Sequence, residues 1–510
     1  MRPRDLREAV AWVDRSGVAP LIERLLRPNR RGRPRQLSVR TLFVGMKLAV
    51  DTSKTACLTD VHSLLVHGLV PSAQRDLSVI DPRTGAVISL HQVRRLLSAI
   101  QAKLDPSPAT ATGLSSEELD DRAASLQEVI DLMLAATMPT RIAHTGGYAV
   151  DGTGTWSWAK GRRREDRSPD PDAAWGVKTH KSGRTEAYFG YELHAVVRIG
   201  PTGADGSDTP CLAERISVVP ASTSPTRPVL DTLARMTTDG HRIRDVVADR
   251  GYTYKNDWAP GLHALGIDPV ADLHANQYGP RGTHAGARIV AGTPHCPAMP
   301  AAFDTIQRPD RLVPTLALDT FAADIERREQ WALRRVAGPD RDGKERYECP
   351  ARAGKIRCPL QPSSLSLPLA TPTVLAPPDP DIAPTCCSQR TITVPGDVDA
   401  KARQRHYWGS PNWIKAFNRR SRVEGWFGNL KNDNTEALGR GAFRVMGICK
   451  TSIMVAVFAV ATNLRLLRAW ARRTLGNDDL MPLLSATPDP PIDSPELRSD
   501  HCATGPPTGQ

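Results

Sequence analysis

Long apolar runs are scarce in this chain of 510 residues. The longest is IMVAVFAVA, Ile453–Ala461, which is too short to cross a bilayer as a helix. The N-terminal stretch MRPRDLREAV has no apolar core of the kind found in signal peptides. Charged residues make up 24% of the chain. We therefore expect a soluble, cytoplasmic protein without a membrane partner, long enough for several domains or for one large domain with insertions.

Regular cysteine patterns are missing as well. The 9 cysteines are odd in number and irregularly spaced, and no Cys-x-x-Cys pair occurs. This argues against a disulfide framework and against the common zinc-finger spacings. Five cysteines nevertheless lie close together in the sequence, and for these we favour free thiols while a zinc site stays open: Cys296, Cys349, Cys358, Cys386 and Cys387.

Acidic residues are few in two regions of a chain whose net charge is +12. Residues 1–40 hold 11 arginines and 4 acidic residues, and residues 401–473 hold 15 lysines and arginines and 3 acidic residues. Residues 474–510 are the reverse, with 6 acidic residues and 1 arginine. Two basic regions flanking a nearly balanced middle are typical of a protein that binds nucleic acid. The expected partner is DNA or RNA.

Residues 1–105 have the apolar spacing of helices and predict a helical DNA-binding domain. One helix is expected to begin at Ser38, and another has Ser89 as a plausible N-cap. A basic arm punctuated by glycine and proline precedes the first of them. Its arginines suit phosphate contacts, although a solvated arm that orders only on DNA fits the same residues: Arg31, Arg33 and Arg35.

Residues 106–140 are expected to form a linker and a helix, and after them the sequence pattern changes from helical to strand-like. Within 141–271, residues 146–153, 186–200 and 211–221 read as strands, and helices then alternate with a further strand that ends at an aspartate. This order predicts an α/β fold with a mixed sheet and helices covering it.

The remainder divides into three segments. Residues 272–405 form a Pro-rich, Cys-bearing insertion with a long stretch that has no helical or strand period, so we expect a mobile loop there. Residues 406–473 return to helical patterns and complete the core. Residues 474–510 are rich in proline and aspartate and are expected to be a disordered acidic tail.

Three carboxylates occupy positions that suit metal chemistry. Asp151 and Asp249 each end a predicted strand, and Glu424 lies in a predicted helix. Neighbouring strands lie about 4.8 Å apart, so acids at their ends converge easily. Two Mg²⁺ or Mn²⁺ ions bound there, with Asp151 bridging them, are suited to phosphoryl transfer. For any one of these acids, a plain role in a turn or cap is the alternative.

The stretch FNRRSRVEGWFGNLKND, residues 417–433, concentrates aromatic and basic residues around one acid. As a single helix turning about 100° per residue, it brings side chains spaced 3, 4 and 7 apart onto one stripe. An ordinary helix with inward aromatics and an i,i+4 ion pair is the alternative. The stripe consists of Phe417, Arg420, Glu424 and Lys431, and Trp413 extends it.

These residues carry a resemblance to a known family. The order strand-Asp, strand-Asp, helix-Glu resembles the DDE transposases of bacterial insertion sequences. One large group of them has the signature Tyr-x2-Arg-x3-Glu-x6-Lys, and this chain has that spacing from Phe417 to Lys431 with Phe in place of Tyr. The segments YAVDGT, FGYELHAVV, ADRGY and RGRPRQLSVRTLFVGMKLAV are also similar to family segments. The resemblance covers most of residues 20–270 and 405–470.

The resemblance implies a ribonuclease-H-like catalytic core interrupted by an insertion. It implies that Asp151, Asp249 and Glu424 are the catalytic, metal-binding residues. It also implies that the protein contacts double-stranded DNA, both terminal inverted repeats and target DNA, as a dimer or higher assembly. Trp413 is open to a second role, core packing. The DNA contacts expected are Phe417, Arg420, Lys431, Arg31, Arg33, Arg35, Tyr252 and Trp413.

The activity expected from this resemblance is metal-dependent cleavage of the ends of the element and their transfer to target DNA. Two other functions remain open. One is a catalytically decayed or domesticated relative that only binds DNA. The other is a ribonuclease-H-like nuclease without strand transfer.

Overall fold

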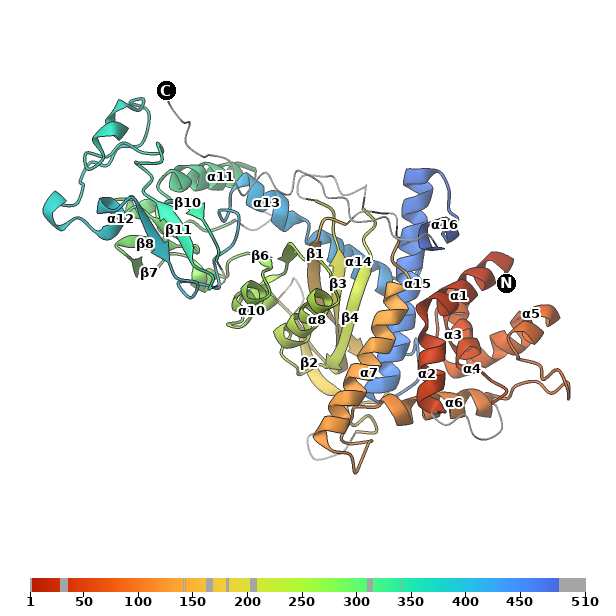
Figure 1. Ribbon diagram of the computed structural model, residues 1–510. Coiled ribbons are helices and arrows are strands. Elements are labelled where there is room, and N and C mark those ends of the chain that lie inside the picture. Colours follow the sequence, from red (N-terminus) through yellow and green to blue (C-terminus); the bar gives the residue numbers. More distant parts are fainter. Residues whose placement is uncertain are drawn as a thin grey trace, which may run out of the picture.

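The computed structural model describes residues 2–27, 35–140, 142, 144–161, 168–179, 183–201, 209–309, 315–340 and 342–485. Helices of the N-terminal region lie at one end of the molecule, a sheet lies in the middle, and the insertion lies at the other end (Figure 1). Arg31 and Arg33 of the predicted basic arm lie outside the described residues, as does the chain from 486 onward.

The N-terminal region is helical. Ser38 caps its helix through a hydrogen bond from the Thr41 backbone N–H, and Ser89 forms a capping box with Gln92, so both helices begin where the sequence indicates. The elements are α1 (Pro3–Ser16), α2 (Val18–Leu26), α3 (Val39–Ser53), α4 (Leu58–Ser63), a π-helical turn (Leu64–Gly68), α5 (Pro71–Asp76) and α6 (Leu90–Leu104).

Two long helices join this region to the sheet. They are α7 (Ser116–Ala135) and α15 (Ile448–Leu475), and both contact strand β4 (Ala213–Pro220) (Figure 1). Among the described residues, α15 is the one helix long and apolar enough to span a membrane. Its most apolar window is 78% buried, as in the core helix of a soluble protein.

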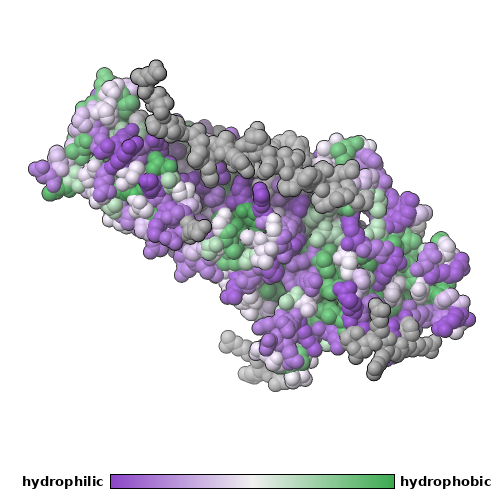
Figure 2. All heavy atoms as spheres, in the orientation of Figure 1, coloured by the Kyte–Doolittle hydropathy of each residue, from purple (hydrophilic) through white to green (hydrophobic). Residues whose placement is uncertain are grey.

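The outer surface is also consistent with α15 being a buried core helix. On the face drawn in Figure 2, hydrophilic residues predominate, and hydrophobic residues form separate patches rather than a continuous band. The apolar side of α15 is covered by neighbouring helices and by the sheet, so a lipid environment is not required to cover it.

The central sheet is mixed, as expected. β3 (Thr185–Arg198) pairs antiparallel with β1 (Gly147–Trp156), β2 (Ala174–Thr179) and β4. β5 (Asp245–Val247) pairs parallel with β1, and β6 (Asp268–Val270) pairs parallel with β5. The short strands β2 and β6 were not recognised in the sequence. The coarse prediction of an α/β protein with a mixed sheet is confirmed.

Helices cover both faces of this sheet, because alternate residues of its strands enter two different cores. Tyr148 and Val150 of β1 pack with residues of α8 (Thr226–Thr238) and α10 (Trp258–Ala264). Ala149, between them, belongs to the large core that includes α7 and α15. Even-numbered positions of β1 therefore face α8 and α10, and odd-numbered positions face α7 and α15.

The insertion contains more regular structure than its sequence indicates. Two three-stranded antiparallel sheets are present, together with helix α11 (Thr315–Gln330) and the short helix α12 (Thr385–Ser388). Strands of only 3 to 5 residues are too short to display a period in the sequence. The strands are β7 (Pro280–His284), β8 (Ala287–Val290), β9 (Thr293–His295), β10 (Arg334–Ala337), β11 (Glu345–Glu348) and β12 (Thr391–Val394).

Two expectations for the C-terminal part are wrong. The stretch around Glu424 is not one helix but two, α13 (Pro411–Asn418) and α14 (Ser421–Lys431). The two helices meet at Arg419 and Arg420, which keep right-handed helical backbone angles, and the Arg419 guanidinium is held by Asp245, with 2.7 Å between Nη2 and Oδ2. The segment after residue 474 begins folded. Helix α16 (Met481–Ser485) follows α15, and Leu480 and Leu484 are buried.

Candidate active site

Asp151 and Asp249 lie side by side at the level where β1 and β5 meet. The parallel register pairs Ala149 with Val247, so the positions two residues further along each strand are also neighbours. Because side chains alternate along a strand, Asp151 and Asp249 share the face of Ala149 and Val247, which is the face covered by α14. The two carboxylates are thus brought together by strand register.

Helix α14 carries Glu424 to the same place. Lys431, at the end of the helix, donates hydrogen bonds of 2.6 Å to Thr153 Oγ1 and to the Gly154 carbonyl oxygen of β1. Seven helical residues back from Lys431 is about 10 Å, and three strand residues back from Gly154 is also about 10 Å. Glu424 therefore stands at the level of Asp151.

The electrostatics of Asp151 show that the three acids interact. Burial and the negative charges of Asp249 and Glu424 raise the pKa of the Asp151 carboxyl to about 7. The Gly152 N–H, 2.8 Å from Asp151 Oδ1, and the Arg420 guanidinium lower it by favouring the charged form. Three carboxylates from β1, the end of β5 and α14 thus form one negatively charged cluster, which we call the carboxylate cluster.

Asp249 and Glu424 of the carboxylate cluster also make ordinary local contacts, a helix cap and an i,i+4 ion pair, which were the alternatives expected from the sequence. Asp249 caps the short helix α9 (Arg250–Thr253), accepting a hydrogen bond of 2.9 Å from the Gly251 N–H. Glu424 pairs with Arg420 one turn away, at 2.8 Å. The Glu424 side chain is 47% exposed, so it remains accessible to a ligand. A cap and an i,i+4 pair do not prevent either acid from serving the cluster.

The aromatic rings predicted to contact DNA lie in the core. Trp413 and Phe417 are buried and stacked, with ring centroids 4.9 Å apart and planes 8° from parallel. Trp413 Nε1 donates to the Ala271 carbonyl oxygen at 3.1 Å. Neither ring is accessible to a base in this arrangement. Core packing, which was the alternative role expected for Trp413, therefore applies to both rings.

The basic residues of the predicted stripe are differently placed. Arg420 lies over the Phe417 ring, 5.8 Å from its centroid, and reaches the carboxylate cluster through Glu424. Lys431 is anchored on β1, and burial lowers the pKa of its ammonium to about 8. Arg35 is exposed, 3.7 Å from Glu23 in the N-terminal region. The fold thus brings Arg420 and Lys431 to the acids and leaves Arg35 elsewhere.

Tyr252 lies behind the cluster rather than on its open side. Its ring is buried and its hydroxyl is 2.7 Å from His194 Nδ1. Burial raises the pKa of this phenol well above its usual value, and the charges of Asp151, Asp249 and Glu192 add to the effect. At this position Tyr252 lies behind the acids and does not reach DNA.

Glu192 of β3, an acid near Asp249 on the sheet face opposite to that of Asp151, was missed in the sequence. Burial and the charge of Asp249 raise the pKa of its carboxyl. Gly152 makes room for it, since a Cβ there would stand 3.0 Å from Glu192 Oε1 and 2.9 Å from His194 Nδ1. The alternation of Glu192 and His194 along an otherwise apolar strand was the available signal.

The insertion also contributes a cation. Arg308 lies over the rings of Trp413 and Phe417, 5.1 and 5.2 Å from their centroids, and its Nη1 is 3.1 Å from Asp272 Oδ2. Arg250, the residue after Asp249, reaches the same Asp272 oxygen at 2.8 Å. Arg250 and Arg308 thus share Asp272, and Arg308 and Arg420 lie over the same Phe417 ring; we call these three arginines the basic rim. These three arginines are far apart in the sequence, so the fold assembles the rim.

The carboxylate cluster fits a hard divalent cation. Mg²⁺ and Mn²⁺ prefer oxygen ligands and are often held by one or two carboxylates, with substrate phosphates supplying the rest. The raised pKa of Asp151 reflects repulsion and burial that a bound cation relieves. Within the described residues, no three His, Cys, Asp or Glu side chains are gathered tightly enough to hold an ion unaided. A site completed by phosphate oxygens needs no such cage.

Comparison with known proteins adds no family assignment. No protein-family model matches the chain, and no curated protein matches it.

Proposed function

We propose that this protein is a divalent-metal-dependent transposase that binds the ends of its own DNA element, cleaves them and joins them to target DNA. The observation that carries the proposal is the meeting of Asp151, Asp249 and Glu424. They come from β1, the end of β5 and α14, and 175 positions separate the last two in the chain. The ribonuclease-H-like character of the core belongs to this proposal, supported by the mixed sheet with acids on two adjacent strands.

The proposed chemistry is distributed over the residues of the cluster. Bound there, Mg²⁺ or Mn²⁺ ions would activate the attacking oxygen and stabilise the leaving one. Asp151, between the other two acids, would contact both ions, while Asp249 and Glu424 would each hold one. Arg420 neutralises Glu424 in the DNA-free protein at 2.8 Å, and it is placed to turn to a DNA phosphate once a cation takes over that carboxylate.

Substrate binding is assigned to the basic residues. Arg420, Arg308 and Arg250 border the acids, and the arm that includes Arg35 adds charge in the N-terminal region. Cations beside a metal-binding cluster draw in a polyanion without base-specific contacts. A second candidate function, a nuclease of the same core without strand transfer, shares the cluster. The basic flanks favour the transposase, because holding a specific DNA end needs contacts beyond the cleavage point.

The test is cleavage of DNA that carries the sequences bordering this gene. Wild-type protein, Glu424→Gln and a control, Glu117→Gln, are compared by nicking assay in Mg²⁺ and by gel shift on the same DNA. Glu117 is an exposed acid in the first turn of α7 and takes no part in the carboxylate cluster. We expect Glu424→Gln to bind DNA normally and to cleave about a thousandfold more slowly.

The control variant is expected to cleave like the wild type. Cleavage by Glu424→Gln at the wild-type rate would contradict the assignment of the cluster. Strand transfer is read from the same reactions, as joining of the cleaved 3′ ends to a supercoiled plasmid. Cleavage without joining would favour the nuclease.

A further inference from the structure

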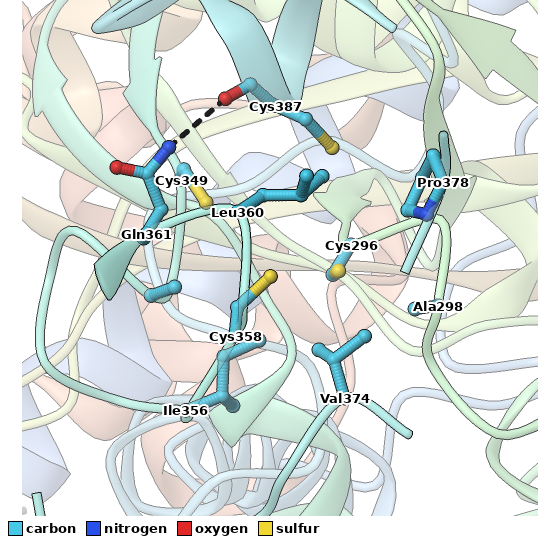
Figure 3. Close-up of a pocket in the computed structure, with 11 residues that line it drawn as sticks. Cys296, Ala298, Cys349, Ile356, Cys358, Leu360, Gln361, Val374, Pro378 and Cys387 are labelled. Atoms are coloured by element: carbon cyan, nitrogen blue, oxygen red, sulfur yellow. Dashed lines mark hydrogen bonds between the residues drawn. The ribbon is translucent and has the colours of Figure 1, made fainter. Parts of the chain in front are cut away.

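Four cysteines of the insertion surround one small void. Cys296 follows β9, Cys349 follows β11, Cys358 lies in the loop after it, and Cys387 lies in α12. All four line a cavity of about 10 Å³, and Figure 3 shows their sulfur atoms directed toward this shared space. They come from four separate segments, so the fold and not the sequence spacing brings them together.

The void has the size and lining of a site for one ion. A volume of about 10 Å³ is close to that of a single water-sized sphere. A water molecule needs two to four polar partners. Apart from the sulfurs the lining is largely apolar, and its Gln361 side chain already donates to the Cys387 carbonyl oxygen. Thiolate sulfurs around such a void instead suit a soft divalent cation.

Three of these cysteines share a local sequence pattern, because a proline directly follows each of Cys296, Cys349 and Cys358. The Cys-Pro repeat is the feature that these three otherwise separate segments have in common.

The four cysteines around the void are all buried. All eight described cysteines are free thiols, so no disulfide among them competes for these sulfurs. In the part of the chain that the structure describes, no three His, Cys, Asp or Glu side chains, these cysteines included, are close enough to hold an ion as they stand. Zinc binding would draw the four sulfurs inward to about 2.3 Å from the ion.

We propose that Cys296, Cys349, Cys358 and Cys387 bind one structural zinc ion that joins the two small sheets of the insertion. Binding converts four thiols and Zn²⁺ into a tetrathiolate zinc centre and releases four protons, with no change of oxidation state. Cys296 belongs to the segment after the β7–β8–β9 sheet, whereas Cys349 belongs to the β10–β11–β12 sheet. Cys387 lies in the small hydrophobic core of the insertion, whereas Cys296, Cys349 and Cys358 belong to the large core, and one ion bound to all four would tie these two cores together.

Cys386 provides a matched control. It is the neighbour of Cys387, its sulfur lies 3.9 Å from that of Cys387, and both are buried. Cys386 does not line the void, whereas Cys387 does. The proposal therefore separates two adjacent cysteines of one short helix. Cys211, outside the insertion, is a second control.

The experiment measures zinc in the full-length protein purified under reducing conditions, by plasma mass spectrometry, before and after incubation with Zn²⁺ alone. We expect about one zinc per chain in the wild type, Cys386→Ser and Cys211→Ser, and less than about a fifth of that in Cys358→Ser and Cys387→Ser. Wild type without bound zinc after incubation would overturn the site. Zinc lost from Cys386→Ser and retained in Cys387→Ser would overturn the choice of ligands.

A second measurement does not depend on the variants folding. Wild-type protein loaded with Co²⁺ is expected to show the intense visible bands of tetrahedral cobalt and a thiolate-to-cobalt charge-transfer band, both abolished by added Zn²⁺. Weak bands typical of six oxygen ligands would contradict the proposal, as would iron with inorganic sulfide in the isolated protein.

Discussion

The carboxylate cluster of the sheet and the cysteine cluster of the insertion are two groups of like ligands with opposite surroundings. Glu424 is 47% exposed, and the acids adjoin a basic rim. The four cysteines are buried around a void of about 10 Å³ with a largely apolar lining. Oxygen ligands on an open face leave positions for a substrate, while four sulfur ligands complete the coordination of a zinc ion. Under the two proposals made above, the carboxylate cluster is a site for chemistry and the cysteine cluster is a site for stability.

The positioning of the two clusters differs as well. Strand register fixes Asp151 beside Asp249, and Lys431 fixes α14 on β1. The cysteines are instead held by turns and short segments, with Cys296, Cys349 and Cys358 in the large core and Cys387 in the small core of the insertion. In the carboxylate cluster the fold itself sets the positions of the acids. In the cysteine cluster the metal is expected to stabilise the protein.

The largest expected effect comes from removing metal selectively. Chelation of Mg²⁺ with EDTA is expected to abolish DNA cleavage at once, and fresh Mg²⁺ to restore it, with no change in the melting of the insertion. Removing zinc with a thiolate-competing chelator is expected to be slow and to expose the insertion to protease. Cleavage assays and limited proteolysis on the same samples measure both. If EDTA made the insertion sensitive to protease as quickly as it stops DNA cleavage, the proposed difference between the carboxylate cluster and the cysteine cluster would be contradicted.

The next effect concerns the junction of α13 and α14. Arg419 and Asp245 form a buried ion pair, with side chains 8% and 9% exposed. Arg419→Ala leaves the buried Asp245 carboxylate with the longer contact to Arg244, 3.3 Å, so we expect a loss of about 2 kcal/mol in the free energy of unfolding. The control is Arg227→Ala, which removes an exposed pair with Asp231 and should change stability by less than about 0.5 kcal/mol. Urea denaturation measures both, and equal values would show that the junction does not depend on this pair.

A tenfold effect is expected from pH on the carboxylate cluster. Because the pKa of Asp151 is raised to about 7, a proton competes with the metal below that pH. Mn²⁺ affinity should fall about tenfold per pH unit below 7 and level off above it. The raised pKa also means that ionised Asp151 destabilises the metal-free fold above pH 7, so Asp151→Asn should raise the melting temperature there, and not near pH 4.

Electron paramagnetic resonance of free Mn²⁺ measures that affinity, and Asp151→Asn serves as its control. In this variant binding should be weak at every pH between 6 and 8. A pH dependence that survives in Asp151→Asn would assign the titrating group to another residue.

The smallest effect concerns the basic arm. Replacing Arg31, Arg33 and Arg35 by Ala is expected to weaken DNA binding a few-fold. The salt dependence of the affinity should also become shallower, by about 0.9 in logarithmic slope for each phosphate that the arm neutralises. Three exposed arginines elsewhere, replaced together, form the control: Arg83, Arg227 and Arg327. Fluorescence anisotropy between low and moderate salt gives the slopes. Identical slopes for the two triple variants would leave the arm without a specific role.

The sequence predicted the parts that depend on local pattern. The long strands around Asp151 and the helices that begin at Ser38 and Ser89 lie where apolar periodicity and capping residues indicate. The junction between α13 and α14 did not follow from the pattern, and Arg419 at this junction is held by Asp245, 174 residues away. Glu192 was missed because it is brought to the site by strand pairing and not by a motif.

The sequence indicated part of the cysteine cluster but not which four cysteines lie together. Its spacings match no common zinc motif, since the four ligands come from segments that the short strands of the insertion bring together. The signal that was present is the repetition of Cys-Pro at Cys296, Cys349 and Cys358. Trp413 and Phe417 show the converse, because an aromatic pair within a basic segment resembles a DNA contact in sequence and is a buried stack in the fold.

The most direct test of the proposed function is excision in cells. A marker flanked by the DNA that borders this gene is supplied with the wild-type protein or with Asp249→Ala, and loss of the marker is scored by sequencing the resealed junction. We predict excision by the wild type and none by Asp249→Ala. Absence of excision from both, with both proteins expressed and bound to those ends, would contradict the proposal and identify the chain as a DNA-binding protein without transposase activity.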